Sequence, residues 1–449
     1  MNAGAGGAEA ESGAGDESGA GDESGADGQS GADPESGADR KSGAEPPLRV
    51  STLEIFFDLV FAFSLTQLTA VLAGHQTWRA AAQVLLVFGL LWWMYGAYAW
   101  LTNSRPPVHT AERLLLLVGM AGFLIIGLAI PRGFGRYGVV LGLGYLVVVL
   151  VHAVLYYRVN ANILRVAPFN ITSALLVTLA GLPPGQHDGA ISPAGYGLWV
   201  AALAVQLGSP LIVHPKSFFE LRPAHFSERH SALLIVAIGE SVAAVGIGAA
   251  GPASRAGPVS WHLLASAVLG LAVAAALWWT VFGSGDEERG ERALAQATGE
   301  RRTALALNAY FYGNIPLLLG LIAMAAGVLR AVVLAGGEAG PGPGSDARIW
   351  QAAVLAGGAT LFLAGDVIIR RQLRAGPVGL RGWAAAAALA TIPAGVYAGL
   401  NTQLILVAAV LAAPLIGESR AARDQDAAGG PGPATGGAPG GAAEGGAAG

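Results

Sequence analysis

The chain has 449 residues, of which 53% are hydrophobic and only 12% are charged. Soluble domains carry about a quarter charged residues, so this composition excludes an ordinary soluble protein. The chain contains no Cys, which excludes disulfides, thiolate metal sites and cysteine nucleophiles.

The first 46 residues repeat a pattern of Gly, Ala, Ser and acidic residues, and after Met1 they offer no large apolar side chain to bury. Such a segment cannot offset the entropy cost of ordering, so we expect a disordered tail. Its 11 acidic residues outnumber Arg40 and Lys41, which gives the tail a net charge of −9 and leaves +5 for the rest of the chain. Residues 421–449, rich in Gly, Ala and Pro, are expected to form a second disordered tail.

Long apolar runs fill residues 47–420 between the two tails. About 20 apolar residues suffice for a helix to cross a bilayer. The runs therefore predict an all-α fold, a polytopic integral membrane bundle of about twelve transmembrane helices. The expected spans are 53–73, 80–100, 114–130, 137–157, 163–182, 195–213, 231–250, 261–282, 305–330, 349–369, 383–400 and 402–417. Only a turn near Asn401 separates the last two, and Pro316 breaks the ninth.

The distribution of basic residues predicts how the protein is oriented. Cytoplasmic loops of membrane proteins carry an excess of Lys and Arg. If both termini and every second loop share one side, that side holds 20 of the 26 basic residues. We therefore expect a multi-pass protein of the plasma membrane with both termini in the cytoplasm.

The first span carries Glu54, Asp58 and Gln67 within an otherwise apolar run. Glu54 and Asp58 stand four residues apart and so lie on one helical face. A charged carboxylate in contact with lipid costs about 2.5–3.5 kcal/mol, so this face is expected to contact protein or water. Glu54 also fits a capping box with Ser51, which is the simpler role for it. Asp58 lies one turn deeper and is the better candidate for a functional site.

The seventh span contains Glu240 close to the middle of the membrane. Arg229 precedes it by eleven residues on nearly the same helical face, about three turns away, so the two cannot pair within that helix. Glu240 therefore needs a partner from another helix, bound water or a proton. It is either a proton- or cation-binding carboxylate or a polar clamp between helices.

Other polar groups have simpler explanations. His225 and His230 flank Glu228, but a spacing of five residues does not place them on one helical face, so we expect no metal ion there. The charged run at 283–302 is expected to be a solvated helix with ion pairs between residues four apart.

Two more polar positions lie in the later spans. Asp366 precedes Arg370 by four residues and is expected to pair with it. Asn314 lies just before Pro316, which deprives a carbonyl near Tyr312 of its helical partner. That carbonyl could serve a ligand or simply mark a bend.

The chain also contains a possible internal repeat of two six-helix halves, 47–222 and 223–420. Glu54 aligns with Glu228, and Thr66-Gln67 then align with Glu240-Ser241, at an offset of 174 residues. An offset of six spans would make the two helices parallel. The repeat remains a hypothesis, because a single pair of apolar helices also aligns by chance.

These polar stretches resemble the bacterial low temperature requirement protein A family. The residues that carry the resemblance are Glu54-Ile55-Phe56-Phe57-Asp58-Leu59-Val60-Phe61 with Gln67, and Glu228-Arg229-His230 with Ile238-Gly239-Glu240-Ser241. A weaker match is Tyr312-Gly313-Asn314-Ile315-Pro316-Leu317, where the family often has His in place of Asn314, so no acid–base role is carried onto Asn314. The resemblance covers roughly residues 48–417. It implies the membrane architecture, singles out Asp58 and Glu240, and brings no established reaction or substrate.

Two classes of function remain open. In the first, a transporter or channel, Asp58 and Glu240 bind a proton, a cation or a small solute between the two halves. Further binding candidates are Glu54, Glu228, Arg229, Gln67 and Asn314. In the second, a non-transporting sensor or assembly protein, the carboxylates only lock helices together. A polar cavity lined by both carboxylates would favour the first class, and a dry contact the second.

The sequence shows no Ser/His/Asp arrangement, Gly-rich phosphate loop or zinc-ligand spacing. We therefore expect no enzyme activity, no catalytic residue and no cofactor. The expected partners are the lipid bilayer and a small ion or solute, and no nucleic acid.

Overall fold

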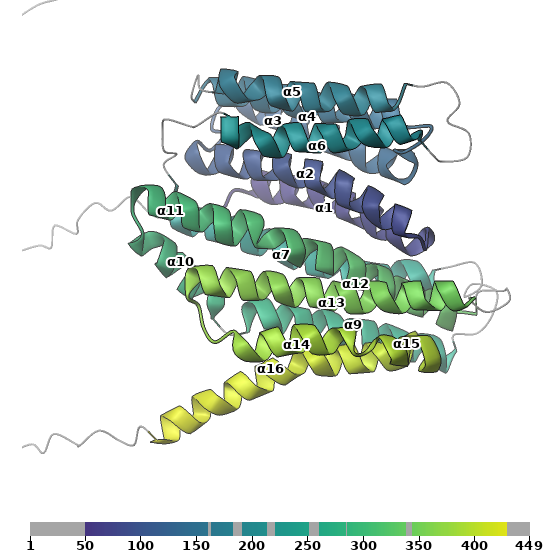
Figure 1. Cartoon of the computed structure of the whole chain (residues 1–449). Coiled ribbons are helices and arrows are strands. Elements are labelled where there is room, and N and C mark those ends of the chain that lie inside the picture. Colours follow the sequence, from purple (N-terminus) through teal and green to yellow (C-terminus); the bar gives the residue numbers. More distant parts are fainter. Residues whose placement is uncertain are drawn as a thin grey trace, which may run out of the picture. The chain divides into compact units, whose positions relative to one another are not determined.

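The computed structural model describes residues 50–159, 163–182, 191–212, 221–250, 260–283, 285–337 and 344–428. The chain divides into two units, Met1–Pro46 and Pro47–Gly449. The first unit, which is the predicted acidic tail, lies outside the described residues, and all the described helices belong to the second unit. Across the described ranges the regular secondary structure is entirely helical (Figure 1).

The first six helices coincide with the first six predicted spans. They are α1 (Thr52–Gly74), α2 (Trp78–Ser104), α3 (Thr110–Ala129), α4 (Gly138–Tyr157), α5 (Ile163–Ala180) and α6 (Pro193–Ile212), with a short 3-10 turn η1 (Ile130–Arg132) after α3. Pro131 within this turn lacks the backbone N–H that a continuing α-helix would need, which accounts for the end of α3.

The later helices follow a less regular course. They are α7 (Pro223–Ala249), α9 (Trp261–Phe282), α10 (Asp286–Gln296), α11 (Gly299–Leu305), the π-helix η2 (Ala306–Tyr312), α12 (Asn314–Ala335), α13 (Ser345–Leu373), α14 (Gly379–Leu389), α15 (Ile392–Ala398) and α16 (Leu400–Ala428). The break of the ninth span was expected at Pro316, but Pro316 lies in the first turn of α12 and the irregular backbone precedes it as η2. There the backbone N–H of Gly313 donates to the carbonyl of Asn308, five residues back, at 3.1 Å.

Ten helical stretches of the described residues are long and apolar enough to cross a membrane, compared with the twelve predicted spans. The sixth predicted span forms α6, and the eleventh forms α14 and α15, and neither is among the ten. Pro393 in the first turn of α15 separates α14 from α15. Gly399, whose φ of 92° favours glycine, separates α15 from α16.

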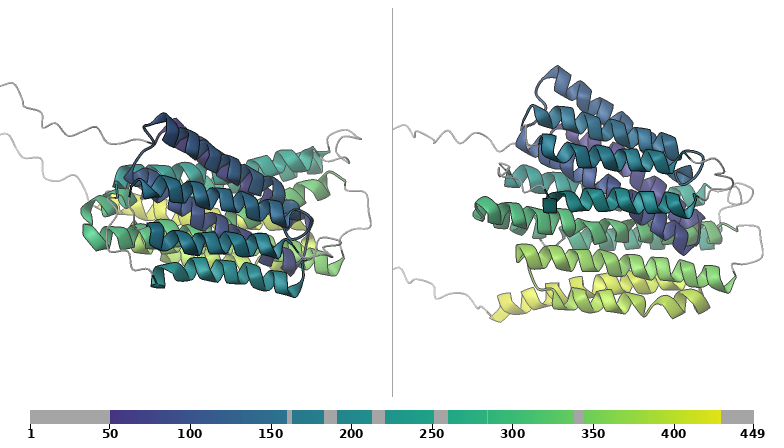
Figure 2. Two further views of the ribbon diagram at one scale, coloured as in Figure 1. Left: turned by 90° about the horizontal axis from the view of Figure 1, so that it is seen from above. Right: turned by 45° about the horizontal axis from the view of Figure 1, so that its top comes forward.

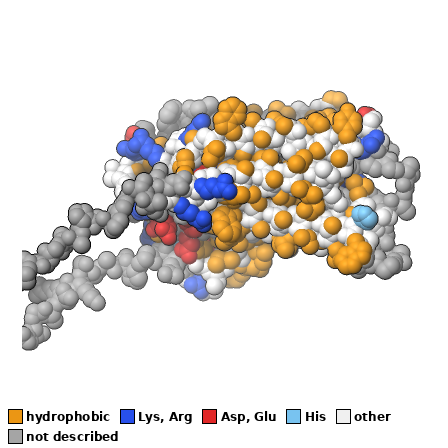
Figure 3. Space-filling view, turned by 90° about the horizontal axis from the view of Figure 1, so that it is seen from below, with side chains coloured by type: hydrophobic (Ala, Val, Ile, Leu, Met, Phe, Trp, Pro, Cys, Tyr) orange, Lys and Arg blue, Asp and Glu red, His pale blue; other side chains and the backbone are white. Residues whose placement is uncertain are grey.

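Exposed aromatic side chains lie near both ends of the helices. On α9, Trp261 is 84% exposed at the first residue and Trp279 is 58% exposed near the last turn. Eighteen residues of helix separate them by about 27 Å, close to the thickness of a hydrocarbon core. Figure 3 shows hydrophobic side chains over the middle of one face and Lys and Arg side chains gathered mainly at one end. This surface fits a bilayer.

The helices that correspond to the first six predicted spans form a closed ring of neighbours, and so do the helices that correspond to the last six. In the first, α1 contacts α3, and contacts continue through α4, α5, α6 and α2 back to α1. In the second, the order is α7, α12, α13, α14 with α15, α16, α9 and back to α7. The two rings meet where α1 contacts α7 and α12, and where α2 contacts α7. In the right-hand view of Figure 2 the purple and blue helices of the first ring lie above the green and yellow helices of the second.

Two regions differ from the expectation. The charged run is not one solvated helix: α10 ends before Ala297, Leu294 is fully buried, and Asp286 forms an ion pair with Arg370 of α13. An acidic side chain at the start of α10 that reaches a buried Arg therefore packs this segment against the bundle. The second tail was expected to begin at residue 421, but α16 continues to Ala428 through an Ala- and Arg-containing stretch of high helix propensity, and residues 429–449 lie outside the described residues.

Candidate functional site

The start of α1 is fixed by the predicted capping box. The Ser51 hydroxyl accepts from the backbone N–H of Glu54 at 3.3 Å, and the Glu54 carboxylate accepts from the backbone N–H of Ser51 at 3.0 Å. Both bonds satisfy backbone groups that the helix leaves unpaired at its N-terminus. The prediction that Glu54 caps α1 is confirmed.

Glu54 also belongs to a buried ion cluster that joins α1 to α7. Arg229 of α7 places Nη1 at 3.1 Å from Glu54 Oε1 and Nη2 at 3.3 Å from Asp58 Oδ1. The three side chains are at most 1% exposed. One guanidinium can contact both carboxylates because they lie one turn apart on the same face of α1.

Side chains from α1 and α2 enclose the Arg229 guanidinium. The Thr102 hydroxyl accepts a hydrogen bond from Nη1, and the Tyr95 hydroxyl donates to Asp58 Oδ1 at 3.0 Å. The rings of Phe57 and Tyr95 lie 5.5 Å and 5.7 Å from the guanidinium carbon, within cation–π range. The cation is thus held by carboxylates, a hydroxyl and aromatic faces together.

His225 extends the cluster toward the end of α2. Its Nε2 lies 3.2 Å from Glu54 Oε2, and its Nδ1 lies 3.2 Å from the Asn103 amide nitrogen. The Asn103 amide is fixed by the Arg222 backbone, whose carbonyl accepts from the Asn103 nitrogen at 3.0 Å. Because that nitrogen can only donate, Nδ1 accepts and Nε2 carries the proton toward Glu54. His225 can therefore complete the cluster as a neutral ring.

The cluster contains more acid than base. Two carboxyl groups, Glu54 and Asp58, share the single guanidinium of Arg229. Among the described residues Asp58 Oδ2 has no hydrogen-bond partner. Asp58 therefore has an oxygen atom on which a proton could reside without breaking the pair with Arg229.

The second polar contact between α1 and α7 lies deeper. The Thr66 hydroxyl donates to Glu240 Oε2 at 2.6 Å, and Glu240 is 8% exposed. Within the described part of the chain, Glu240 Oε1 has no hydrogen-bond partner. A carboxylate in this position has one neutral hydroxyl as its partner rather than an ion pair.

The structure does not bring Asp58 and Glu240 together. Asp58 and Thr66, which contacts Glu240, stand eight residues apart on α1, or about 12 Å along the helix axis. Phe61 and Leu65 lie between them along α1 and are 0% and 2% exposed, with the Phe61 ring packed against α2 and α3. The two polar contacts between α1 and α7 are therefore separated along α1 by buried apolar residues.

The sequence of contacts along the two helices also shows the relative direction of α1 and α7. Glu54 and Asp58 meet Arg229 near the starts of the two helices, and Thr66 meets Glu240 further along both. The helices are therefore parallel, as an offset of six spans requires.

The other predicted binding residues lie apart from the two sites. Glu228 is exposed and accepts from the backbone N–H of Val50 at 3.2 Å. Gln67 is half-buried, and its neighbour Thr66 is the residue that contacts Glu240. Asn314 is buried, and its amide nitrogen donates to the Tyr310 carbonyl at 2.7 Å beside η2.

A further ion network was only partly predicted. Asp366 Oδ1 lies 3.8 Å from Arg370 Nε, as expected. Asp366 Oδ2 lies closer to Nη1 of Arg381 in α14, at 2.8 Å. Arg381 also contacts Glu418 of α16 at 2.9 Å and is fully buried. In the sequence, the only indication of this contact was Arg381 itself, a single basic residue in an apolar segment. This network joins α13, α14 and α16 near the C-terminal end of α13.

No group of three or more His, Cys, Asp or Glu side chains within the described ranges is arranged to hold a metal ion. The Arg229 guanidinium already occupies the space between the carboxylates of Glu54 and Asp58. The groups present at the α1–α7 interface are carboxyl groups, a guanidinium and hydroxyls, which can form ion pairs and hydrogen bonds.

Known proteins are similar to this chain along most of its length. An uncharacterized protein of Rhizobium meliloti (strain 1021) is 25% identical over an alignment of 289 residues, and the match covers 61% of this chain and 67% of the relative. No solved structure matches the chain. A family model described as bacterial low temperature requirement A protein (LtrA) matches residues 49–416, a range that contains both sites of the α1–α7 interface. The chain therefore belongs to the bacterial low temperature requirement A family.

Proposed function

We propose that this multi-pass membrane protein moves protons across the bilayer and that Glu240 is the group that carries them. The observation that supports this most is the Glu240 carboxyl group itself. It is 8% exposed on a membrane-spanning helix, its Oε2 accepts from Thr66, and its Oε1 has no partner among the described residues. An ionised carboxylate in such a place needs a cation or a proton.

The ligand set favours a proton over a metal cation. Glu240 and Thr66 together supply two carboxylate oxygens and one hydroxyl. Hard cations such as Ca²⁺ take about 6–8 oxygen ligands, whereas a proton needs a single oxygen. A larger solute would need a cavity that this contact, at 2.6 Å, does not leave between the two side chains.

Asp58 is a second position at which the proton can stop. It shares Arg229 with Glu54 and keeps one oxygen without a described partner. In the proposed cycle a proton reaches Asp58 from the side of the membrane where α1 begins. It then passes to Glu240 when the apolar layer at Phe61 and Leu65 rearranges. The described contacts correspond to a state in which this layer is closed.

We infer further that the two rings are repeated halves and that all twelve predicted spans cross the membrane. The rings have the same order of neighbours, and their first helices, α1 and α7, are parallel. The proton site then lies between the halves, where a rocking motion would expose it to either side.

The proposed orientation places the protein in the plasma membrane with both termini in the cytoplasm. A reporter fused after Leu101 or after Arg292 is expected to register as cytoplasmic, and one within residues 186–192 as external. The reason is the concentration of 20 of the 26 basic residues on one side. External reporters after Leu101 and Arg292, together with a cytoplasmic reporter within residues 186–192, would overturn the orientation.

A non-transporting sensor or assembly protein is the second candidate. The pairing of Arg229 with both Glu54 and Asp58 favours it, because a buried bridge of this kind holds α1 and α7 in one register. The separation of Asp58 from Glu240 favours it as well, because the two carboxylates do not line one shared polar cavity. On this alternative Glu240 is also a clamp, and its proton does not exchange.

Proton flux into proteoliposomes tests the proposal. The full chain is reconstituted with a pH-sensitive dye inside the vesicles, and a pH gradient is applied across the membrane. The wild type is expected to conduct protons, and Glu240→Gln is expected to lower the rate at least about tenfold, because the amide cannot exchange a proton. Flux from K⁺ and Na⁺ gradients is measured in parallel.

Glu228→Gln is the matched control. Glu228 lies on the same helix but is exposed at its surface, so the variant should conduct like the wild type. A wild type that conducts no protons would reject proton transport. A Glu240→Gln variant with wild-type flux would reject the role of Glu240.

A further inference from the structure

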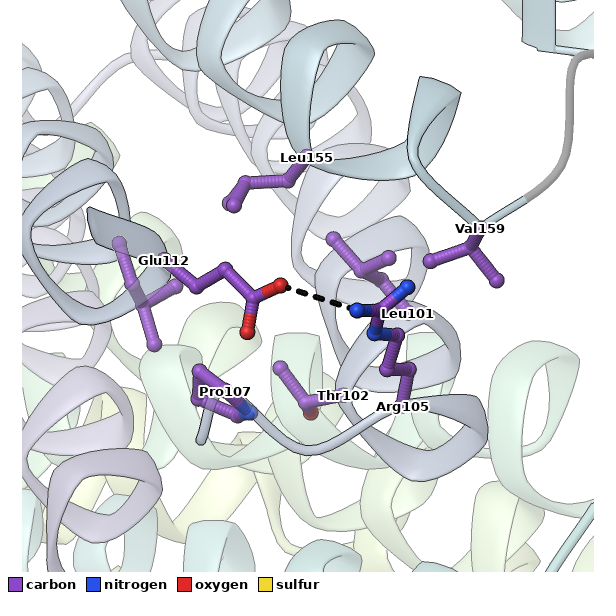
Figure 4. A pocket seen from close by; sticks show the side chains of 8 residues that line it. Leu101, Thr102, Arg105, Pro107, Glu112, Leu155 and Val159 are labelled. Atoms are coloured by element: carbon purple, nitrogen blue, oxygen red, sulfur yellow. Dashed lines mark ion pairs between the residues drawn. The ribbon is translucent and has the colours of Figure 1, made fainter. Parts of the chain in front are cut away.

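A small cavity lies where the ends of three helices of the first ring meet. It has a volume of about 20 Å³, and its wall includes Thr102 of α2, Leu116 of α3 and Leu155 of α4. Figure 4 shows Thr102 and Leu155 on opposite sides of an ion pair between Arg105 and Glu112. A volume of this size accommodates one water molecule, provided that polar groups line it.

One wall of the cavity is shared with the buried ion cluster. Thr102 lines the cavity, and its hydroxyl accepts a hydrogen bond from Nη1 of Arg229. Behind Arg229 lie Glu54 and Asp58. A water molecule in the cavity would therefore be separated from the guanidinium by a single side chain.

The ion pair crosses the cavity between Thr102 and Leu155 (Figure 4). Arg105 Nη2 lies 3.4 Å from Glu112 Oε1, and the side chains are 43% and 7% exposed. The pair is a weak closure, because Arg105 is partly exposed to solvent and also donates to the Arg158 carbonyl at 3.3 Å. Glu112 in turn accepts from the backbone N–H of His109 at 3.4 Å, which holds its carboxylate in place at the start of α3.

We propose that this cavity is a water-binding vestibule through which solvent reaches the Arg229 cluster, and that the Arg105–Glu112 ion pair closes it. Its polar groups are the Glu112 carboxylate and the Arg105 guanidinium, which together can form the two to four hydrogen bonds of a bound water. Opening requires only the Arg105 side chain to turn outward. The proposal goes beyond proton transport and does not depend on it, since a sensor would use the same access.

Thiol labelling tests the vestibule, because the native chain has no Cys and each variant carries a single thiol. Thr102→Cys and, separately, Leu155→Cys are placed in the full chain in lipid nanodiscs. Each is treated with a small methanethiosulfonate reagent. Both thiols are expected to react slowly, and adding Arg105→Ala should speed the reaction about two- to fivefold, as the loss of a partly exposed ion pair allows.

Two controls make the result specific. Ala325→Cys, buried on α12, should stay unreactive with or without Arg105→Ala. Arg371→Ala, which removes an exposed Arg elsewhere, should leave the rates at Thr102→Cys and Leu155→Cys unchanged. Labelling of both cavity thiols that is insensitive to Arg105→Ala would overturn the closure. Rates equal to that of Ala325→Cys in every background would overturn the vestibule itself. Proton flux does not enter either outcome.

Discussion

Replacing Arg229 with Met is expected to lower the free energy of unfolding by about 3–5 kcal/mol, because it leaves buried carboxylates without their cation. Glu54 and Asp58 are at most 1% exposed, so water cannot take over the role of the guanidinium. Met keeps much of the side-chain volume, which separates the loss of charge from the loss of packing. Unfolding of the purified chain in mixed micelles, followed by circular dichroism, measures the effect.

The neutralised cluster provides the control. A triple variant with Arg229→Met, Glu54→Gln and Asp58→Asn should regain most of the lost stability, since no unpaired charge remains. Arg371→Met changes an exposed Arg and should alter the stability by at most about 0.5 kcal/mol. If Arg229→Met unfolds no more easily than Arg371→Met, the cluster does not hold α1 and α7 together.

The second large effect is expected at Glu240, where two substitutions should separate function from stability. Glu240→Gln keeps an oxygen that can accept from the Thr66 hydroxyl, so it should fold with nearly unchanged stability while losing pH-dependent flux. Glu240→Ala removes that acceptor and should lower the free energy of unfolding by about 1–3 kcal/mol. The two variants should thus be equally inactive but unequal in stability.

Thr66→Val is the matched change on the partner helix. It removes the hydroxyl that donates to Glu240 but keeps the shape of the side chain and leaves the exchangeable carboxyl in place. The variant should still conduct protons, with an altered dependence on pH. A Gln variant with full flux, or a Val variant without any, would contradict the assignment of Glu240 as the carrier.

The features that follow from local chemistry could be predicted from the sequence. The capping box needs only Ser51 and Glu54 at the start of an apolar run. The shared face of Glu54 and Asp58 follows from helical periodicity, and the helices themselves follow from the apolar runs.

The partners across helices could not be predicted in the same way. The spacing of Arg229 and Glu240 excluded a pair within α7, but nothing local to the sequence says which helix packs against Arg229. Thr66 is a partial exception. The repeat hypothesis aligns it with Glu240, and equivalent positions of parallel neighbouring helices lie at similar depth, where these two are hydrogen-bonded.

The last third of the chain departs furthest from the expectation because its helices are interrupted. The buried position of Arg381 depends on α14 ending before Thr391 and on α16 returning beside it, which places Glu418 within reach. Asp366 had an obvious partner four residues away, and that local explanation concealed the closer contact with Arg381. Packing between helices that are distant in the sequence, rather than helical periodicity, determines which Arg lies closer to Asp366.

The most direct test of proton exchange is to observe the proton on Glu240. Infrared difference spectra of the chain in lipid, recorded as the pH is changed, report the carbonyl stretch of protonated carboxyl groups. The wild type and Glu228→Gln should show a pH-dependent carboxyl band that Glu240→Gln lacks, because the amide removes the titrating group. Identical pH-dependent spectra for the wild type and Glu240→Gln would contradict proton exchange at Glu240 and leave it as a clamp between α1 and α7.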